Sequence, residues 1–435
     1  MKIHKNFWIA LAVFILMVAA SQFFHHMIFS RFAYLIGLVI LTGAIWTGLS
    51  LRGIIFKRSS KDSRYECGQV FEENYQIEND SFIPKTWLKV DDLSNLPSIP
   101  ASNVITLIKS HQNRYYQTML VLTDRGEYTL GPTMISSGDP FGFFEIRKTI
   151  PNEKKILVFP LVFNLDYLNT LKGNLTGGRA RRESITDTTP NSGGVRDYHP
   201  GDPLNRIHWK TSIRQQRWFV REFDQDPQSN LWVFLDGFQE NHLRVSQNNV
   251  SVHLQPREVH FYKAERILPL DNFEYSVSIA ASLSQQFLKD GRAVGLICTG
   301  QNTLFLAPEK GERQIIKILE NLSYIMPLGE LPYAALVQTN ADLVTKGNSL
   351  VLITSSWDAS LQIALDMLIR KSISIYFVYV EPIGFGGLAP YKGSLLDLQD
   401  RGIPTTIIRP GDDFSTALGS QIWGVERPFE NKYSR

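Results

Sequence analysis

The residues best suited to chemistry lie in one short stretch, Gly193–Phe223, which reads GGVRDYHPGDPLNRIHWKTSIRQQRWFVREF. Two histidines, His199 and His208, stand close to Asp197 and Asp202, and a histidine paired with a carboxylate can act as acid and base. The stretch has no nucleophile in a recognisable setting, no HExxH sequence and no triad order. We therefore expect that it does not catalyse a reaction and that the protein is not an enzyme.

Positive charge is concentrated around the same stretch. Lys172 to Arg221 holds ten Lys and Arg against four Asp and Glu, a balance of +6, whereas the whole chain is only +3. Such an excess indicates an anionic counterpart: buried carboxylates, a phosphate-bearing ligand, an acidic protein or lipid headgroups. The basic run Arg179–Arg182 could contact phosphates, but no aromatic stacking platform or nucleic-acid-binding fold accompanies it. We expect a solvated linker there and no nucleic-acid partner.

Two interpretations of the stretch remain open, and they can hold together. In the first it joins two domains: Trp209 is a buried anchor, Asp202 caps a short helix that begins at Pro203, and Arg196 or Arg206 pairs with an internal carboxylate. In the second it is a docking surface, because Arg, Trp and Tyr are enriched at interface hot spots and a basic patch suits an acidic partner. The residues that we predict to form this motif are Arg196, Asp197, Tyr198, Gly201, Asp202, Arg206, His208, Trp209, Lys210 and Arg221.

An α/β domain is predicted from residue 227 to residue 435. Buried parallel strands are indicated by apolar runs, and the helices by apolar residues at helical spacing. The predicted strands are 231–236, 293–298, 303–307, 349–354, 373–380 and 405–408, and the predicted helices are 273–288, 312–322, 333–344, 361–370 and 395–400. This alternation predicts a doubly wound, mostly parallel sheet with helices on both faces.

Ligands of such sheets bind beyond the carboxyl ends of the strands, where the strand order reverses. We therefore expect a site, if there is one, among residues 236–240, 354–358 and 381–387. An insertion at 239–271 follows the first strand and contains His242, His253 and His260. Their spacing is not that of a metal site, so we interpret the insertion as a surface feature.

A β-rich domain is predicted over residues 62–168, between the N-terminal region and a connecting segment at 169–226 that contains the motif. Short β-branched or aromatic runs separated by turn residues indicate strands, here at 86–90, 104–108, 117–122, 126–132 and 156–160. Their number and spacing predict a small antiparallel β-sandwich. The loop Asp139–Phe144 is expected to form a packed corner with its aromatic side chains in the core.

The first 61 residues are predicted to form a transmembrane helical hairpin. Asn6–Phe24 carries no charged residue, Phe32–Leu51 repeats the pattern, and each stretch is close to the ~20 residues that cross a bilayer as a helix. Lys2 and Lys5 precede the first span and further basic residues follow the second, so the positive-inside rule places both chain ends in the cytoplasm. A cleaved signal peptide ending near Ala20 is the competing interpretation. Both interpretations place residues 56–435 in the cytoplasm of a cell whose inner membrane holds the anchor, and the two cysteines, Cys67 and Cys298, are expected to be buried thiols.

The central motif resembles that of a bacterial family called domain of unknown function 58. The resemblance rests on Arg196–Lys210 (RDYHPGDPLNRIHWK), on Val220–Glu222, on Tyr275–Leu283 (YSVSIAASL), on the upstream pattern from Arg125 to Gly142 and on the N-terminal hairpin. It implies a C-terminal domain similar to the von Willebrand factor type A fold. It also implies a role as a scaffold or adaptor, because members of the family tend to be encoded beside MoxR-like AAA+ ATPases.

The same resemblance raises the question of a metal. Type A domains often hold a divalent cation in an Asp-x-Ser-x-Ser loop after the first strand. Here the matching residues are Asp236–Glu240 (DGFQE), which keep the aspartate and lack both serines. We predict no cofactor and no metal at this degenerate site, with a metal-dependent ligand-binding domain as the alternative function. The leading prediction is a non-enzymatic, membrane-anchored cytoplasmic scaffold, with a MoxR-like ATPase as the partner that the resemblance suggests.

Overall fold

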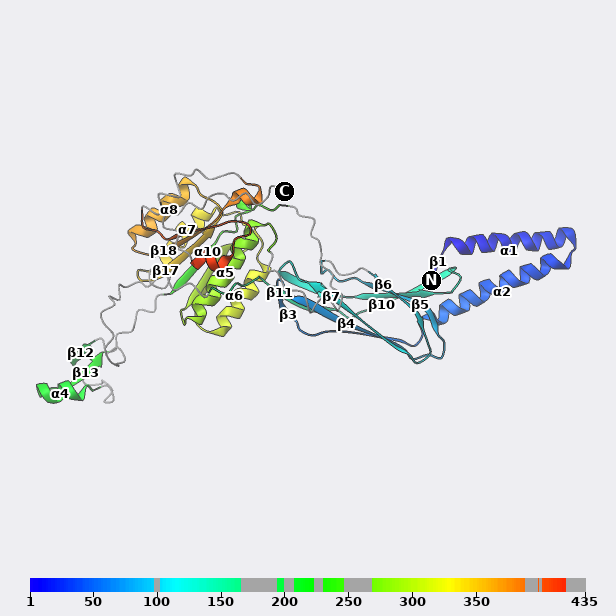
Figure 1. Ribbon diagram of the computed structural model, residues 1–435, viewed down its shortest axis with the longest axis horizontal. Helices are drawn as coiled ribbons and strands as arrows, with labels where there is room; N and C mark the ends of the chain where they lie inside the picture. The colour runs from blue at the N-terminus through cyan, green and yellow to red at the C-terminus, as the bar shows by residue number, and fades with distance from the viewer. Residues whose placement is uncertain are drawn as a thin grey trace. The chain divides into compact units, whose positions relative to one another are not determined.

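The structure, a computed structural model, describes residues 1–97, 102–165, 194–198, 207–222, 230–245, 268–387, 398 and 401–419. These residues fall into two compact units (Figure 1). The first unit holds Met1–Leu161, and the second holds nearly all of the described residues from Val162 onward.

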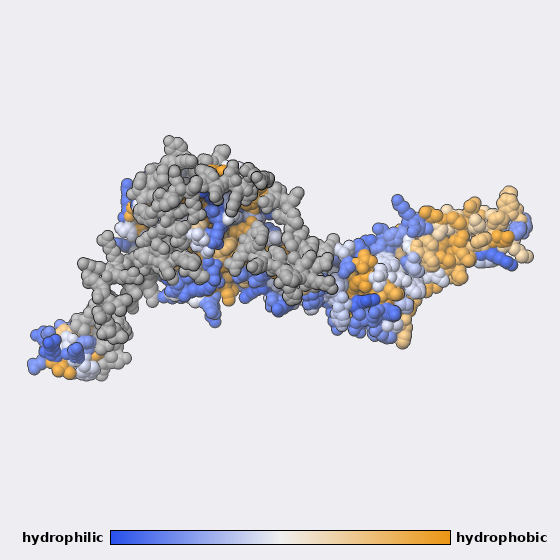
Figure 2. Space-filling view, viewed as in Figure 1, coloured by the Kyte–Doolittle hydropathy of each residue, from blue (hydrophilic) through white to orange (hydrophobic). Residues whose placement is uncertain are grey.

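Two long apolar helices begin the first unit. α1 (Lys5–Phe24) and α2 (Met27–Ser50) are both long enough and apolar enough to cross a membrane. They lie antiparallel, and Gly37 of α2 allows the ring of Phe14 in α1 to approach its backbone closely. No residue of α1 is buried, and Figure 2 shows the pair as a largely hydrophobic surface. The two predicted apolar helices are therefore confirmed, with the second beginning five residues earlier than expected.

The rest of the first unit consists of three small sheets. The five-stranded sheet has the order β1-β10-β9-β5-β6 and is antiparallel throughout. A second, antiparallel sheet has the order β2-β4-β7, and the third, β3-β11-β8, contains one parallel pair. The strands are β1 (Lys2–Ile3), β2 (Ile54–Ser60), β3 (Arg64–Glu66), β4 (Val70–Asn79), β5 (Lys85–Asp92), β6 (Ser102–Ile108), β7 (Asn113–Val121), β8 (Gly126–Leu130), β9 (Thr133–Gly138), β10 (Phe144–Ile150) and β11 (Lys154–Phe159).

The predicted strands of this region are confirmed as β5, β6, β7, β8 and β11. The sequence prediction missed β1, β2, β3, β4, β9 and β10, several of which are short or carry charged or small residues. β4, for example, reads VFEENYQIEN and buries alternate residues, including Phe71, Tyr75 and Ile77. Alternation of this kind is the mark of a half-buried strand.

A buried ion network lies inside the β-rich region. The guanidinium of Arg58 on β2 donates hydrogen bonds to both carboxylate oxygens of Glu73 on β4 and to both oxygens of Asp92 on β5. The hydroxyl of Tyr75 donates to Glu73 at 2.7 Å and approaches Asp92 at 3.0 Å. The side chains of Arg58, Glu73 and Asp92 are all at least nine-tenths buried. Buried charges of this kind persist only when they are paired and hydrogen-bonded, so the network ties β2, β4 and β5 together.

The second unit is built on a six-stranded sheet with the order β16-β15-β14-β17-β18-β19. The strands are β14 (Leu231–Leu235), β15 (Val294–Thr299), β16 (Thr303–Glu309), β17 (Ser349–Thr354), β18 (Ser374–Val380) and β19 (Thr405–Ile408). All neighbours are parallel except β15 and β16. The chain thus builds outward from β14 on one side and then returns to add β17, β18 and β19 on the other.

Helices cover both faces of this sheet. α7 (Tyr333–Thr339) and α8 (Ala359–Arg370) pack on Trp232, Phe234, Leu350, Leu352 and Phe377. The long helix α5 (Asn272–Lys289) contacts β14, β15, β17 and β18, and none of its residues belongs to that cluster, so it covers the other face. α6 (Glu312–Tyr324), α10 (Phe414–Gly419) and the short 3-10 turns η2 (Gln239–Asn241), η3 (Ala341–Leu343) and η4 (Pro382–Phe385) complete the described part. The predicted alternation of strands and helices is confirmed, apart from the helix at 395–400, most of which lies outside the described residues.

Candidate functional site

The described part of the central motif folds back on itself. β12 (Gly194–Asp197) pairs with β13 (Phe219–Glu222) in antiparallel register, and α4 (Trp209–Gln215) lies between them in the chain. Beyond the ladder, the N–H of Tyr198 donates to the carbonyl of Trp218 at 2.8 Å and that of His208 to Phe219 at 2.8 Å. The motif is therefore held together by its own backbone hydrogen bonds. We call these described residues, 194–198 and 207–222, the motif module.

Two buried apolar residues and a hydrogen bond to Ser212 hold α4 and β13 together. Ile207 and Val220 are buried, and the Ser212 hydroxyl accepts a hydrogen bond from the N–H of Phe219 at 2.9 Å. At the start of the helix, Nδ1 of His208 accepts from the N–H of Thr211 at 3.2 Å, so His208 is the N-cap. The prediction that Asp202 caps a helix here does not apply to α4, which begins seven residues later. Asp202, Gly201, Arg206 and His199 lie outside the described residues.

Trp209 is not the buried anchor that the sequence predicts. Trp209 is 60% exposed, whereas Ser212 is the residue of α4 that is buried and hydrogen-bonded to β13. Trp209 and Ile213, four residues apart, lie together on a neighbouring stripe of the helix, and Ile213 is 76% exposed. The Trp209 prediction was therefore wrong within the part of the chain that the structure describes.

The exposed aromatic residues form a cluster. The ring of Trp218, itself 54% exposed, lies 5.5 Å from the ring of Tyr198 and 6.3 Å from that of Trp209, measured between centroids. Lys210, Arg214 and Arg217 are exposed in the same module. Arg196 and Arg221 belong to β12 and β13, and Asp197, which is exposed, ends β12 opposite Phe219. Aromatic rings beside guanidinium and ammonium groups are the residue types that concentrate binding energy at interfaces.

A second polar cluster lies at the carboxyl ends of β14 and β17, where the order of the strands reverses. Asp236 follows β14 directly and is buried. Its Oδ2 accepts hydrogen bonds from the Thr354 hydroxyl at 2.5 Å and from the Asn241 amide at 2.9 Å, and its Oδ1 accepts from the N–H of Phe238 at 3.1 Å. Burial raises the pKa of the Asp236 carboxyl to about 6, although these hydrogen bonds oppose the rise. The Asp236–Thr354 contact joins two of the three segments among which a site is expected, 236–240 and 354–358.

The groups around Asp236 do not fit a divalent cation. Mg²⁺ and Ca²⁺ need oxygen ligands, whereas two of the three neighbours of Asp236 present N–H groups and only the Thr354 hydroxyl adds an oxygen. The Asp358 carboxylate caps α8 through the N–H of Leu361 at 2.7 Å, and Glu240 is exposed on η2. Among the described residues no group of three or more His, Cys, Asp or Glu could hold a metal ion. This donor set gives no support to the metal-dependent alternative.

The sequence prediction missed the pairing of His242 with Asp271. Nε2 of His242 lies 3.1 and 3.0 Å from the two carboxylate oxygens of Asp271, which also accepts from the N–H groups of Phe273 and Glu274 at the start of α5. Burial by itself would raise the pKa of Asp271, but the hydrogen bonds and the charge of His242 lower it. The sequence signal was available: Asp271 followed three residues later by Glu274 is a helix-start pattern. His253 and His260 lie outside the described residues.

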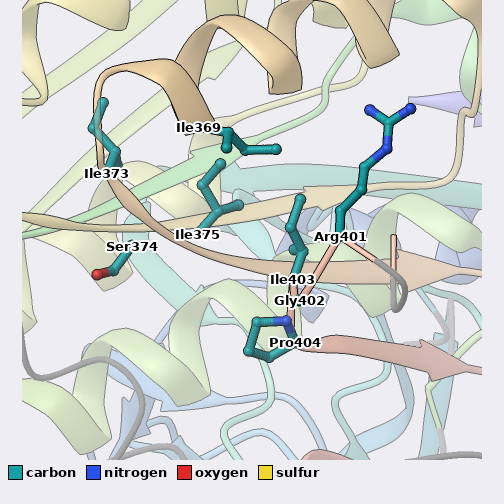
Figure 3. A pocket seen from close by; sticks show the side chains of 8 residues that line it. All are labelled: Ile369, Ile373, Ser374, Ile375, Arg401, Gly402, Ile403 and Pro404. Carbon is teal, nitrogen blue, oxygen red and sulfur yellow. The ribbon is translucent and has the colours of Figure 1, made fainter. Parts of the chain in front are cut away.

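A shallow cavity of about 380 Å³ opens on the opposite edge of the sheet (Figure 3). It lies beside the amino ends of β18 and β19 and is lined by Ile369, Ile373, Ser374, Ile375, Arg401, Gly402, Ile403 and Pro404. The Arg401 guanidinium donates to Asp366. Ligands of doubly wound sheets bind at the carboxyl ends of the strands, so this apolar cavity is not where the sheet would hold one.

Parts of this chain are similar to known protein sequences. Residues 194–254 match the family model described as "Protein of unknown function DUF58". The uncharacterized protein YeaD of Bacillus subtilis (strain 168) is 22% identical over 211 residues, which cover 47% of this chain and 44% of that protein. The match thus spans less than half of the relative's length.

Likeness to solved structures is slight. The CARDB domain of the PF1109 protein from Pyrococcus furiosus covers 24% of this chain and 91% of its own, at 12% identity and a TM-score of 0.19. The alkylpurine DNA glycosylase AlkC of Pseudomonas fluorescens covers 29% of this chain and 38% of its own, at 12% identity and a TM-score of 0.18. Scores this low bear on neither fold nor function.

Proposed function

We propose that this chain, which belongs to the DUF58 family, is a membrane-anchored adaptor that binds a protein partner through its motif module. One observation carries the proposal: Trp209, Trp218 and Ile213 are exposed together, beside Lys210, Arg214 and Arg217. Exposing large apolar side chains to water is unfavourable, and contiguous exposed apolar residues rimmed by charge mark interaction sites. The positive rim favours a partner with an acidic face.

The anchor in this proposal is the pair of helices α1 and α2, which would span the inner membrane with both chain ends in the cytoplasm. The lysines before α1 and the basic residues after α2 support this orientation by the positive-inside rule. Both units then work in the cytoplasm, and the adaptor acts by bringing a soluble partner to the membrane. We propose no catalytic role and no nucleic-acid partner.

The second unit is proposed to be a type A-like domain. The strand order β16-β15-β14-β17-β18-β19, with β16 as the antiparallel edge, supports this assignment. In this interpretation hydrogen bonds take the place of the cation in the loop. Asp236 accepts hydrogen bonds from Thr354 and Asn241 at the position where a type A domain would bind metal. Binding of a partner would then depend on surface complementarity rather than on a bridging ion.

A MoxR-like AAA+ ATPase is the proposed partner, a suggestion that comes from the family resemblance. The test uses the full chain in nanodiscs and an ATPase of this class from the same organism, with nucleotide present. We expect binding that is lost in the double variant Trp209→Ala/Trp218→Ala and retained in Tyr115→Ala, which removes an equally exposed aromatic residue (69%) from β7. Equal binding by the two variants would contradict a role of the module. Failure of the unaltered chain to bind would count against this class of partner.

A further inference from the structure

The two apolar helices are joined rigidly to the β-rich region. Near the end of α2, Gly43, Thr47 and Ser50 are buried, and the loop residue Phe143 packs against the backbone of Gly43. At the start of α1, β1 pairs with β10 and His4 Nε2 lies 3.1 Å from Glu145. Only three residues separate α2 from β2. The β-rich region therefore has a fixed orientation relative to both helices.

Four connections gather at the end of the β-rich region that meets α2: residues 51–53, 80–84, 109–112 and 139–143. The N–H of Asp80 donates to the carbonyl of Gly53 at 2.8 Å. The Ser110 hydroxyl donates to Ser81 at 2.9 Å, which brings the third connection beside the second. We call this set of connections the proximal end.

The fourth connection belongs to the proximal end because β9 runs antiparallel to β5, so the loop after β9 lies at the end where β5 begins. This loop also contacts the first turn of α1. A Cβ placed on Gly142 would lie 3.5 Å from Nδ2 of Asn6, and the Asp139 carboxylate holds the loop in shape by accepting N–H groups of Phe141, Phe143 and Phe144. The predicted packed corner is confirmed for Phe144, which is buried. Phe141 instead points outward and is 48% exposed.

The proximal end presents a second exposed phenylalanine. Phe82 is 86% exposed, and its ring lies nearly perpendicular to that of His111, with 5.1 Å between centroids. Lys2, Lys5, Arg52 and Lys109 are exposed around these loops. Of the acidic groups nearby, Glu145 pairs with Arg147 and lies 3.1 Å from His4 Nε2, and the exposed Asp80 lies 3.6 Å from His111 Nδ1. Apolar tips inside a basic rim suit an anionic lipid surface.

The depth of the loop at residues 139–143 relative to a bilayer follows from the length of α1. A helix of 20 residues, the length of α1, rises about 30 Å, which equals the thickness of the bilayer's hydrocarbon core. If α1 spans the bilayer, its first turn lies at the boundary between acyl chains and headgroups. The loop that touches this turn through Gly142 must then lie at the same boundary.

We propose that Phe82 and Phe141 insert into the headgroup–acyl boundary of the cytoplasmic leaflet, with the neighbouring basic residues on anionic headgroups. The inference rests on the proposed membrane anchor. It adds that the β-rich region is held against the bilayer surface and does not hang from the helices on a free linker. The orientation of the first unit relative to the membrane is thereby fixed.

The test places an environment-sensitive fluorophore at single introduced cysteines in the full chain. The vesicles contain phosphatidylcholine and phosphatidylglycerol, with or without headgroup-level nitroxide lipids. Cys67 and Cys298 are buried, and the unaltered chain measures their background labelling. The test sites are Phe82→Cys and Phe141→Cys. The matched control is Leu93→Cys, which is 50% exposed at the far end of β5, about 25 Å away at the rise of a strand.

We expect blue-shifted emission and nitroxide quenching at positions 82 and 141, and neither at position 93. Ile15→Cys, an exposed site in the middle of α1, reports on the anchor itself. A blue-shifted label at position 15, with labels at 82 and 141 that behave like the one at 93, would overturn the inference and leave the anchor intact. A label at position 15 that shows a water-exposed spectrum would overturn the anchor, and the inference with it.

Discussion

The ammonium group of Lys85 donates a hydrogen bond to the backbone carbonyl of Leu49 at 2.9 Å. Lys85 is the first residue of β5 and is fully buried, and Leu49 belongs to the last turn of α2. The last carbonyls of a helix have no partner within the helix, and a cation there also interacts favourably with the helix dipole. Burial lowers the pKa of Lys85, because removing its charge from water is unfavourable. The hydrogen bond to the Leu49 carbonyl offsets this desolvation.

Replacing Lys85 by Met should therefore loosen the junction between α2 and the β-rich region. Methionine keeps the length of the side chain and removes the donor, which leaves the Leu49 carbonyl without its partner. We expect the free energy of unfolding to fall by about 1–3 kcal/mol. Thermal unfolding of the full chain in detergent measures this, and Lys148→Met, at an exposed position of β10, should change it little. Equal effects of the two substitutions would contradict the assignment.

Arg58→Met should be more damaging than any surface substitution in the same strand. It leaves Glu73 and Asp92 buried without their cation, and breaking a buried ion pair costs about 3–5 kcal/mol. The neighbouring Lys57 is exposed, so Lys57→Met is the control and should alter stability by less than about 0.5 kcal/mol. Chemical denaturation followed by the fluorescence of Trp87 in β5 reports on this region. A midpoint for Arg58→Met close to that of the control would show that the network contributes little.

Asp236 should make stability fall as pH rises through the acidic range. Its pKa is raised from the usual 3.8 to about 6, so between these values the folded state holds a proton that the unfolded state has released. Folding is then penalised progressively above pH 4, by roughly 3 kcal/mol once the pH exceeds 6. Asp236→Asn cannot titrate. The difference in unfolding free energy between the variant and the unaltered chain should change with pH between 4.5 and 7. Two parallel pH profiles would contradict the shifted pKa.

Trp209→Ala should leave the motif module folded, because the side chain is exposed. We expect a change in local stability of less than about 1 kcal/mol. Ile207→Ala, which removes a buried side chain of the same module, should cost about 2–5 kcal/mol. Amide hydrogen exchange of β12 and β13 measures local opening. Loss of protection in Trp209→Ala to the same extent as in Ile207→Ala would restore the interpretation of Trp209 as an anchor.

Much of the α/β domain could be predicted because its signals are local. Continuous apolar runs such as those in 231–236 and 349–354 coincide with β14 and β17, since buried parallel strands have no polar face to interrupt the run. The two apolar helices were predictable for the same reason, because their length and apolar composition are properties of the local sequence. The meeting of Asp236 with Thr354 was predictable as well, because the carboxyl ends of adjacent parallel strands lie at one edge.

The tertiary structure decided what depends on partners distant in the sequence. Arg58 sits among alternating residues of an ordinary strand, and only the pairing of β2 with β4 brings it to Glu73. The same holds for Lys85, whose partner is 36 residues away. The sequence by itself determined which segments are apolar, basic or regular. The sequence does not show that Ser212 and not Trp209 is the buried residue of α4, because this depends on how α4 and β13 come together.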